Sequence, residues 1–405
     1  FEAGKAVTTG IQNTLIGGLA GDALTDADYN VAVGMNALTA DTLGSRSTAI
    51  GRNSLSTQNF TTATDSYNTG VGFAAGNKIT TGQFNTLIGG LAGDALTVGT
   101  RNVAEGYGTL SSDTLGSRSV AIGMNALFTQ NFTTATDSFN TAVGADAGLS
   151  VTTGTENTLI GGLAGDALTT GASNTAVGYR SLSASNTAGG NTAIGGNAML
   201  SDTKGARSVA VGYGTLFSQN FTTATTSFNV AVGYDAGTAI TTGQVNTLIG
   251  ALAGDALTDA DYNTAFGTNA LTTDTLGSRS TALGTSTLQD QNFTTATDTY
   301  NTAVGYDAGA RVTTGVRNTL IGGRSGDALT DADLNVAIGY QALSTDTLGS
   351  RSVAIGNQAL LTQNFTTATD TYNTAVGTDA GLYVTTGVQN TLIGGLAGDA
   401  LTDAD

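Results

Sequence analysis

Four residue types are missing from this chain of 405 residues: cysteine, histidine, proline and tryptophan. The lack of cysteine excludes disulfide bonds and thiolate metal sites. The lack of histidine removes the commonest general base and a common metal ligand. A nucleophile–base pair would have to combine Ser or Thr with Lys, and we therefore expect that the protein is not an enzyme.

Charged residues are also scarce, at 11% of the chain, and they are unbalanced. The 31 acidic residues outnumber the 14 basic ones and give a net charge of −17. Nucleic-acid binding needs a basic surface, so this class is excluded. No apolar run approaches the roughly 18 residues of a membrane span, and no signal peptide opens the sequence. We therefore expect no membrane insertion in this segment.

One short phrase, (Asn/Ser)-(Thr/Val)-small-apolar-Gly, occurs 22 times between Asn13 and Gly394. The step between copies, here called a rung, is usually 17 residues long, but every fourth or fifth rung has 21 residues. Rungs of 17, 17, 21 and 17 residues form a super-repeat of 72 residues, which is once expanded to 89. A short period sustained along a chain predicts a solenoid. Residues 1–405 are predicted to form a single β-solenoid shaft, with both ends truncated from a longer chain.

The five columns of the phrase predict its local structure. Column one is Asn or Ser, column two is always Thr or Val, and column five is always Gly. Beta-branched residues closed by Gly favour a short strand and a turn, and frequent Gly disfavours helix. Columns two and four point to one side of the strand and column three to the other. We expect column three to fill a narrow interior and the Asn side chains to form a hydrogen-bonded ladder.

Column four is apolar in every rung except the one that carries Glu105. On a single chain, columns two and four would form an exposed stripe, and stripes of this size mark interfaces. We predict that the stripe packs against copies of the chain around a symmetry axis, whereas a monomer would expose its Thr residues and favour ice binding. At the axis Glu105 would meet its own copies, which predicts a wet gap or a bound ion. The predicted core residues are Ile16, Val33, Ile50, Ile88, Glu105, Ile122, Val143, Ile160, Val177, Ile249, Val304, Ile338 and Val376.

The run from Ser119 to Ala126 (Ser-Val-Ala-Ile-Gly-Met-Asn-Ala) and the run from Asn301 to Ala308 (Asn-Thr-Ala-Val-Gly-Tyr-Asp-Ala) resemble known repeats. They are similar to the head repeats of YadA-like trimeric autotransporter adhesins, and similar repeats are characteristic of bacteriophage tail fibres. The resemblance covers nearly the whole chain. It implies an all-β, left-handed parallel β-roll of about 22 rungs, in which three chains are intertwined or lie side by side. Adhesin heads use shorter rungs and lack this super-repeat, which favours the tail fibre.

The resemblance implies a structural and adhesive function. The expected protein is a segment of a bacteriophage tail fibre shaft used for host attachment, or alternatively the head of a bacterial trimeric adhesin or another surface fibre. The implied location is a virion tail fibre or the extracellular cell surface. Its expected partners are further copies of the chain, as a homotrimer, and a host-cell surface receptor or glycan.

Acidic turns are the first candidate binding site outside the stripe. The stretch from Gly21 to Asp28 holds three Asp residues and recurs along the chain. Carboxylate oxygens suit Ca²⁺, so these turns are either calcium sites or solvated acidic turns, and no other cofactor is expected. The candidate ligands are Asp22, Asp26, Asp28, Asp255, Asp259, Asp261, Asp327, Asp331 and Asp333.

The long rungs supply the second candidate. Each 21-residue rung contains Gln-Asn-Phe-Thr-Thr-Ala-Thr, and its four extra residues predict an outward loop. Exposed aromatic rings favour contact with partners or sugars, although a Phe tucked under its own loop is the alternative. The candidates are Phe60, Phe132, Phe221, Phe293 and Phe365. An Arg precedes each of these rungs, and we expect it to pair with the Asp five residues earlier, as Arg46 with Asp41.

Overall fold

The computed structural model describes residues 2–403 and 405 as a parallel β-solenoid of about 22 rungs, and these residues form no helix. The repeat solenoid predicted from the sequence is confirmed, with strands that begin 17 or 21 residues apart in each unit. The chain divides into two compact units. Unit 1 runs to Ala206 and includes Thr222–Ala224, and unit 2 comprises Arg207–Phe221 and Thr225–Asp405.

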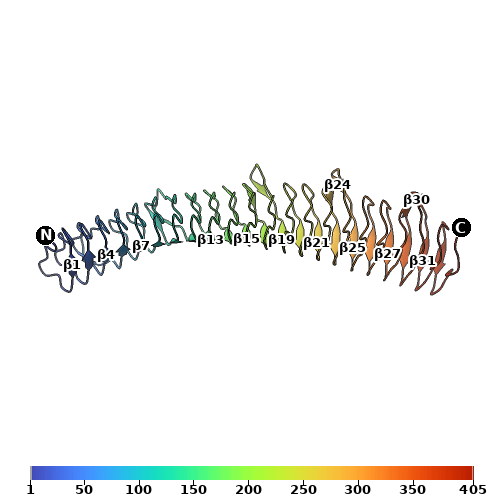
Figure 1. Ribbon diagram of the computed structural model, residues 1–405, viewed down its shortest axis with the longest axis horizontal. Coiled ribbons are helices and arrows are strands. Elements are labelled where there is room, and N and C mark those ends of the chain that lie inside the picture. The colour runs from blue at the N-terminus through green and yellow to red at the C-terminus, as the bar shows by residue number, and fades with distance from the viewer. Residues whose placement is uncertain (1, 404) are drawn as a thin grey trace. The chain divides into compact units, whose positions relative to one another are not determined.

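Unit 1 holds eleven strands of three residues, each paired in parallel with that of the next rung (Figure 1). These strands are β1 (Thr14–Ile16), β2 (Val31–Val33), β4 (Thr48–Ile50), β6 (Thr69–Val71), β7 (Thr86–Ile88), β8 (Val103–Glu105), β10 (Val120–Ile122), β12 (Thr141–Val143), β13 (Thr158–Ile160), β14 (Thr175–Val177) and β15 (Thr192–Ile194). Unit 1 also has two-residue strands. In this set β3 (Gly44–Ser45) pairs with β5 (Thr64–Asp65), and β9 (Gly116–Ser117) pairs with β11 (Thr136–Asp137). The remaining two-residue strand of the unit is β16 (Gly205–Ala206).

Unit 2 is built in the same way, again with eleven three-residue strands in parallel order. They are β17 (Val209–Val211), β19 (Val230–Val232), β20 (Thr247–Ile249), β21 (Thr264–Phe266), β23 (Thr281–Leu283), β25 (Thr302–Val304), β26 (Thr319–Ile321), β27 (Val336–Ile338), β29 (Val353–Ile355), β31 (Thr374–Val376) and β32 (Thr391–Ile393). Unit 2 also has two-residue strands, of which the first is β18 (Thr225–Thr226). In the same unit β22 (Gly277–Ser278) pairs with β24 (Thr297–Asp298), and β28 (Gly349–Ser350) pairs with β30 (Thr369–Asp370).

The interior of each rung is narrow and apolar, as predicted from column three. Ala32 and Leu87, at the middle of their strands, expose no surface, and Leu24 and Leu38 from the later part of the rung fill the same interior. Each fully buried Leu contributes about 2 kcal/mol to folding. Register keeps this column aligned, because within each unit the three-residue strands pair with their neighbours without a shift, as in Ala32 with Ala49.

The constant Gly of column five is explained by the close approach of successive backbones. Gly34 has a φ of 137°, in a region that favours glycine. A Cβ atom there would lie 2.6 Å from the carbonyl oxygen of Gly51 in the next rung. No side chain fits in that gap, so any other residue would push the two rungs apart.

The Asn side chains of column one join each rung to the next. In unit 1 the Asn30 amide nitrogen donates to the carbonyl oxygen of Gly44 at 2.9 Å, and its amide oxygen accepts from the backbone nitrogen of Ser47 at 2.8 Å. The expected ladder is therefore present, but most of its bonds run from side chain to backbone. Because the groups are buried, each bond satisfies a backbone atom that water cannot reach.

In the 21-residue rungs, column one is Ser instead of Asn, and a Gln from later in the rung takes part in the hydrogen bonding. Ser119 replaces Asn in column one, and the Gln130 amide nitrogen donates to its hydroxyl at 2.8 Å and to the buried Asp113 carboxylate at 2.6 Å. The Gln130 amide oxygen accepts from Asn140 at 2.9 Å. Gln130 therefore brings an amide to this level, but its bonds go to side chains, and the backbone nitrogen of Asn140 donates to the Ser138 hydroxyl at 3.5 Å. The arrangement recurs around Gln58, Gln291 and Gln363.

Candidate functional site

The outward side chains of the three-residue strands form a regular surface on each unit, which we call the strand face. Columns two and four point away from the interior, whereas column three is buried. Side chains in column four of unit 1 are substantially accessible, with 39% of Ile50, 37% of Ile88 and 38% of Ile160 exposed. In-register pairing aligns them into a ladder, as in Ile160 with Val177. The predicted apolar stripe is present on the chain.

The structure places every residue predicted for the stripe at the last position of a three-residue strand. Within each unit it brings them together in one column; they are Ile16, Val33, Ile50, Ile88, Glu105, Ile122, Val143, Ile160 and Val177 in unit 1, and Ile249, Val304, Ile338 and Val376 in unit 2. The column also contains Phe266, which is 51% exposed, and Leu283. Both residues stand in column four of the repeated phrase, so the sequence repeat alone identifies them as part of the stripe.

Glu105 interrupts the apolar ladder of unit 1. It ends β8 and is exposed, and its register partners are Ile88 and Ile122. A carboxylate between two Ile side chains is solvated on a single chain, but its burial would carry a large desolvation cost. The prediction that a wet gap or an ion lies at this level remains a prediction.

Aromatic residues beside the strand face were not recognised as part of a surface in the sequence. From Tyr29 to Met35, the side chains at alternate positions, starting with Tyr29, are accessible to solvent. Ala32, in the middle of this stretch, is buried. The position before column one and the position after column five therefore extend the accessible set beyond the strand. Tyr67 and Phe84 stack at 5.6 Å between ring centroids. The sequence feature that could have identified these aromatic residues is their fixed spacing from the Asn of column one.

Arg46 forms a polar cluster with an acidic side chain and two aromatic rings next to the strand face. Its Nε lies 3.0 Å from Asp65 Oδ2, and its guanidinium lies over the rings of Tyr29 and Tyr67, 4.8 and 5.8 Å from their centroids. The hydrogen bond to Asp65 raises the pKa of Arg46. Equivalent ion pairs join Arg118 with Asp137, Arg279 with Asp298, and Arg351 with Asp370.

The predicted pairing of Arg46 with Asp41 is wrong. Asp41 is buried, and its carboxylate accepts hydrogen bonds from Gln58 at 2.6 Å and from the backbone of Gly44 at 3.0 Å. A buried Asp that closes its own turn cannot also reach a guanidinium at the surface. In unit 2, Thr226 stands where the ion-paired Asp would follow Arg207.

Burial has an electrostatic consequence at the equivalent Asp113. Its carboxylate exposes no surface, and desolvation raises the pKa of Asp113 although Gln130 and the backbone of Gly116 donate hydrogen bonds to it. The group therefore contributes to the pH dependence of folding in unit 1.

The acidic turns do not gather their carboxylates. In the first copy, Asp22 accepts a hydrogen bond from Thr39 at 2.5 Å, and Asp28 accepts one from the backbone nitrogen of Ile11 at 2.7 Å. Among residues 2–403 and 405, no three acidic side chains are grouped as a metal site. The geometry gives no support to the calcium prediction for Asp22, Asp26, Asp28, Asp255, Asp259, Asp261, Asp327, Asp331 and Asp333. These carboxylates instead connect adjacent rungs.

The Phe residues of the long rungs are buried, as the alternative of a ring tucked under its own loop predicts, and the prediction of rings presented to partners on protruding loops is wrong. Their exposed fractions lie between 4% and 7%. The ring of Phe60 packs against Gly44, where an added Cβ would lie 2.7 Å from its Cδ2 atom. The exposed part of the loop is Thr61, Thr62 and Ala63. The buried side chains are Phe60, Phe132, Phe221, Phe293 and Phe365.

Comparisons with known proteins add no relative. No protein-family model matches the sequence, and no curated protein matches it. Across the described part of the chain, no helix has the length and hydropathy needed to cross a membrane.

Proposed function

We propose that this chain is a segment of a structural and adhesive fibre, in which three copies associate through their strand faces. The observation that carries the proposal is the in-register ladder of accessible Val and Ile side chains in column four. A monomeric soluble protein rarely exposes a contiguous apolar surface of this extent. A rotational assembly of identical chains would cover the same ladder on each copy at once.

The charge distribution supports the same assembly. The chain carries a net charge of −17, yet column four contains one charged residue, Glu105. Interfaces are depleted of charge at their centres. The acidic residues lie elsewhere on the rungs, where they would keep fibres apart in solution through repulsion.

Between the two kinds of fibre, the repeat favours the shaft of a bacteriophage tail fibre that attaches to a host cell. The rungs of 17 and 21 residues are longer than those typical of YadA-like adhesin heads. The head of a bacterial trimeric adhesin is the alternative. Sequencing the regions that flank this segment in its gene distinguishes them, since a virion-attachment domain supports the fibre and a C-terminal outer-membrane anchor supports the adhesin.

Sedimentation equilibrium tests the assembly itself. The proposal predicts a species with three times the 40.2 kDa mass of one chain. A double variant, Ile122→Lys with Ile160→Lys, places charges in the ladder of unit 1 and should weaken the association. Thr133→Lys adds a charge on an exposed loop and should leave the mass unchanged. A wild-type chain that sediments only as a monomer would refute the proposal.

A further inference from the structure

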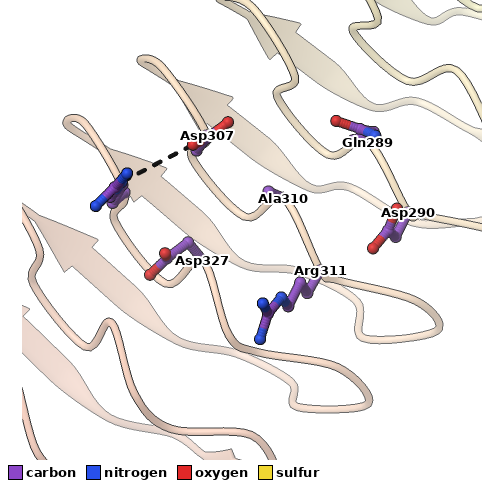
Figure 2. A pocket seen from close by; sticks show the side chains of 7 residues that line it. Gln289, Asp290, Asp307, Ala310, Arg311 and Asp327 are labelled. Carbon is purple, nitrogen blue, oxygen red and sulfur yellow. Dashed lines mark ion pairs between the residues drawn. The ribbon is translucent and has the colours of Figure 1, made fainter.

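One polar hollow in unit 2 stands apart from the repeated surfaces. Its volume is about 460 Å³, and its lining residues are Gln289, Asp290, Asp307, Ala310, Arg311, Arg324 and Asp327. Figure 2 shows that these side chains come from three successive rungs. The volume lies within the range of small-molecule sites.

The hollow occurs where a side chain has been shortened relative to the other super-repeats. Ala310 occupies the position held by Asn77, Leu149, Thr238 and Leu382 in the equivalent rungs. Each of those residues is larger than Ala and would extend into the space. Ala310 is therefore the smallest residue at this position of the repeat.

Three charged residues around the hollow are also specific to it. Arg324 replaces a Leu that occurs at all five equivalent positions, Leu19, Leu91, Leu163, Leu252 and Leu396. Asp290 replaces Thr57, Thr129, Ser218 and Thr362, and Arg311 replaces Lys78, Ser150, Ala239 and Tyr383. With Gln289, which replaces Ser, Phe or Leu, five of the seven lining residues differ from all their counterparts. The rungs of this chain are otherwise nearly identical, yet these five differences lie on three successive rungs and all border the same hollow.

The charges around the hollow are only partly paired with each other. Arg324 Nε lies 3.8 Å from Asp307 Oδ2, which is an ion pair but too long for a hydrogen bond. Among the described residues, Arg311 has no carboxylate within 4 Å. The Ser344 hydroxyl donates a hydrogen bond to Asp327 at 2.5 Å. Donors and acceptors of the lining are thus available to a ligand.

We propose that this hollow binds a neutral, hydroxyl-rich ligand, namely a sugar unit of a glycan. A hydroxyl group both donates and accepts hydrogen bonds, so it can bridge an Asp oxygen and an Arg nitrogen. A simple anion would meet three carboxylates in the same space, and a simple cation would meet two guanidinium groups. The site is formed by the rungs of one chain, so it does not depend on the proposed association of copies.

Ligand-observed saturation-transfer NMR on the full chain tests the site. The probes are methyl glucoside, methyl galactoside, methyl mannoside and N-acetylglucosamine, with glucosamine and glucuronate as charged comparisons. We expect transfer to at least one neutral probe, and loss of that transfer in Ala310→Leu, which fills the hollow with a side chain already present at Leu149. Arg324→Leu should weaken binding by about tenfold, the effect of losing a charged donor.

Both variants restore residues that equivalent rungs already carry, so the fold is expected to survive. Arg317→Gln is the matched control, because it removes one positive charge from a residue outside the lining and adopts the residue at Gln389. Its binding should equal that of the wild type. The proposal is overturned if no neutral probe shows transfer, if only a charged probe binds, or if Ala310→Leu binds like the wild type. None of these outcomes bears on the mass measured by sedimentation, which tests the fibre proposal separately.

Discussion

The 17-residue rung that begins at Asn102 and the 21-residue rung that begins at Ser119 place the same strand in the same register by different means. In the shorter rung, the Asn102 side chain bonds to the backbone at Gly116 and at Ser119, at 2.9 Å each. In the longer rung, the Gln130 amide bonds to the Ser119 hydroxyl and the Asn140 side chain, and the backbone nitrogen of Asn140 donates to the Ser138 hydroxyl. The insertion is tolerated because its polar groups are satisfied from within.

The comparison shows which feature of the rung is held constant. Four extra residues and a new column-one residue leave the pairing of β10 with β12 unshifted, with Ile122 opposite Val143. The outward columns of the strand therefore continue through every long rung of each unit. Variation is confined to the loops, and the strand face is preserved.

The largest effect should come from the feature that both kinds of rung share. Gly161→Ala forces a side chain at a φ of 132° to within 2.5 Å of the carbonyl oxygen of Gly178. We expect a loss of about 4 kcal/mol from strain and overpacking, measured by guanidinium unfolding at one protein concentration. Gly162→Ala is the control, because the nearest atom to its Cβ would be Tyr179 Cδ2 at 3.7 Å. Equal losses in the two variants would show that close backbone approach is not the reason for the constant Gly.

Removal of the substitute amide should have the next largest effect. Gln130→Ala leaves the buried Asp113 carboxylate without its 2.6 Å side-chain donor, and the Asn140 amide nitrogen keeps its bond to Gly154 but loses the one to Gln130. The expected loss in unfolding free energy is about 3 kcal/mol. Gln83→Ala, on a half-buried turn, should cost much less. If the two variants unfold alike, the network is not what stabilises the long rung.

Loss of the amide from a short rung is expected to cost less. Asn85→Ser removes the bonds to Gly99 at 2.9 Å and from the backbone of Asn102 at 3.0 Å, and no Gln is present to replace them. We expect a loss of about 2 kcal/mol in the same unfolding measurement. A variant as stable as the wild type would mean that Ser is sufficient in either rung and that Gln130 is not a replacement.

The buried Asp of the long rung predicts a pH effect. The pKa of Asp113 in the folded protein is raised above the ordinary value of about 3.9 by burial. Between those two pKa values the folded state holds a proton that the unfolded state has lost, so stability falls as pH rises through this window. Asp113→Asn should remove that part of the slope in a pH series of unfolding midpoints, and the exposed Asp137→Asn should not. An unchanged slope in Asp113→Asn would contradict this assignment.

The ion pair at the edge of the long rung should have the smallest effect. Asp137→Ala removes the 3.0 Å contact with Arg118, whose side chain is 41% exposed. The expected loss is under about 1 kcal/mol and should shrink at high salt. Thr226→Asp, which supplies the missing acid beside Arg207, should give a gain of similar size. A loss that is large and independent of salt would indicate that the contact is buried in the assembly.

The repeat predicted most of the fold and less of the chemistry. The phase of Asn, Ala and Gly located the strands, the interior and the outward ladder, because in-register stacking makes each column a spatial line. The sequence did not reveal that Gln130 takes the place of an Asn, since that requires the path of the four inserted residues. It left open whether Phe60 is exposed or tucked under its loop, and it misplaced the partner of Arg46, because composition does not show which side of a turn a side chain takes. The hollow beside Ala310 depends on three rungs at once.

Cysteine labelling tests most directly the claim that the constant strand face is the association surface. The chain has no native cysteine, so Ile160→Cys and Thr133→Cys each introduce a single thiol, one in the ladder and one on an exposed loop. We predict that a maleimide reagent labels Thr133→Cys rapidly and labels Ile160→Cys only after unfolding. Equally fast labelling of both native proteins would contradict the account, because it would show that the strand face is open to solvent.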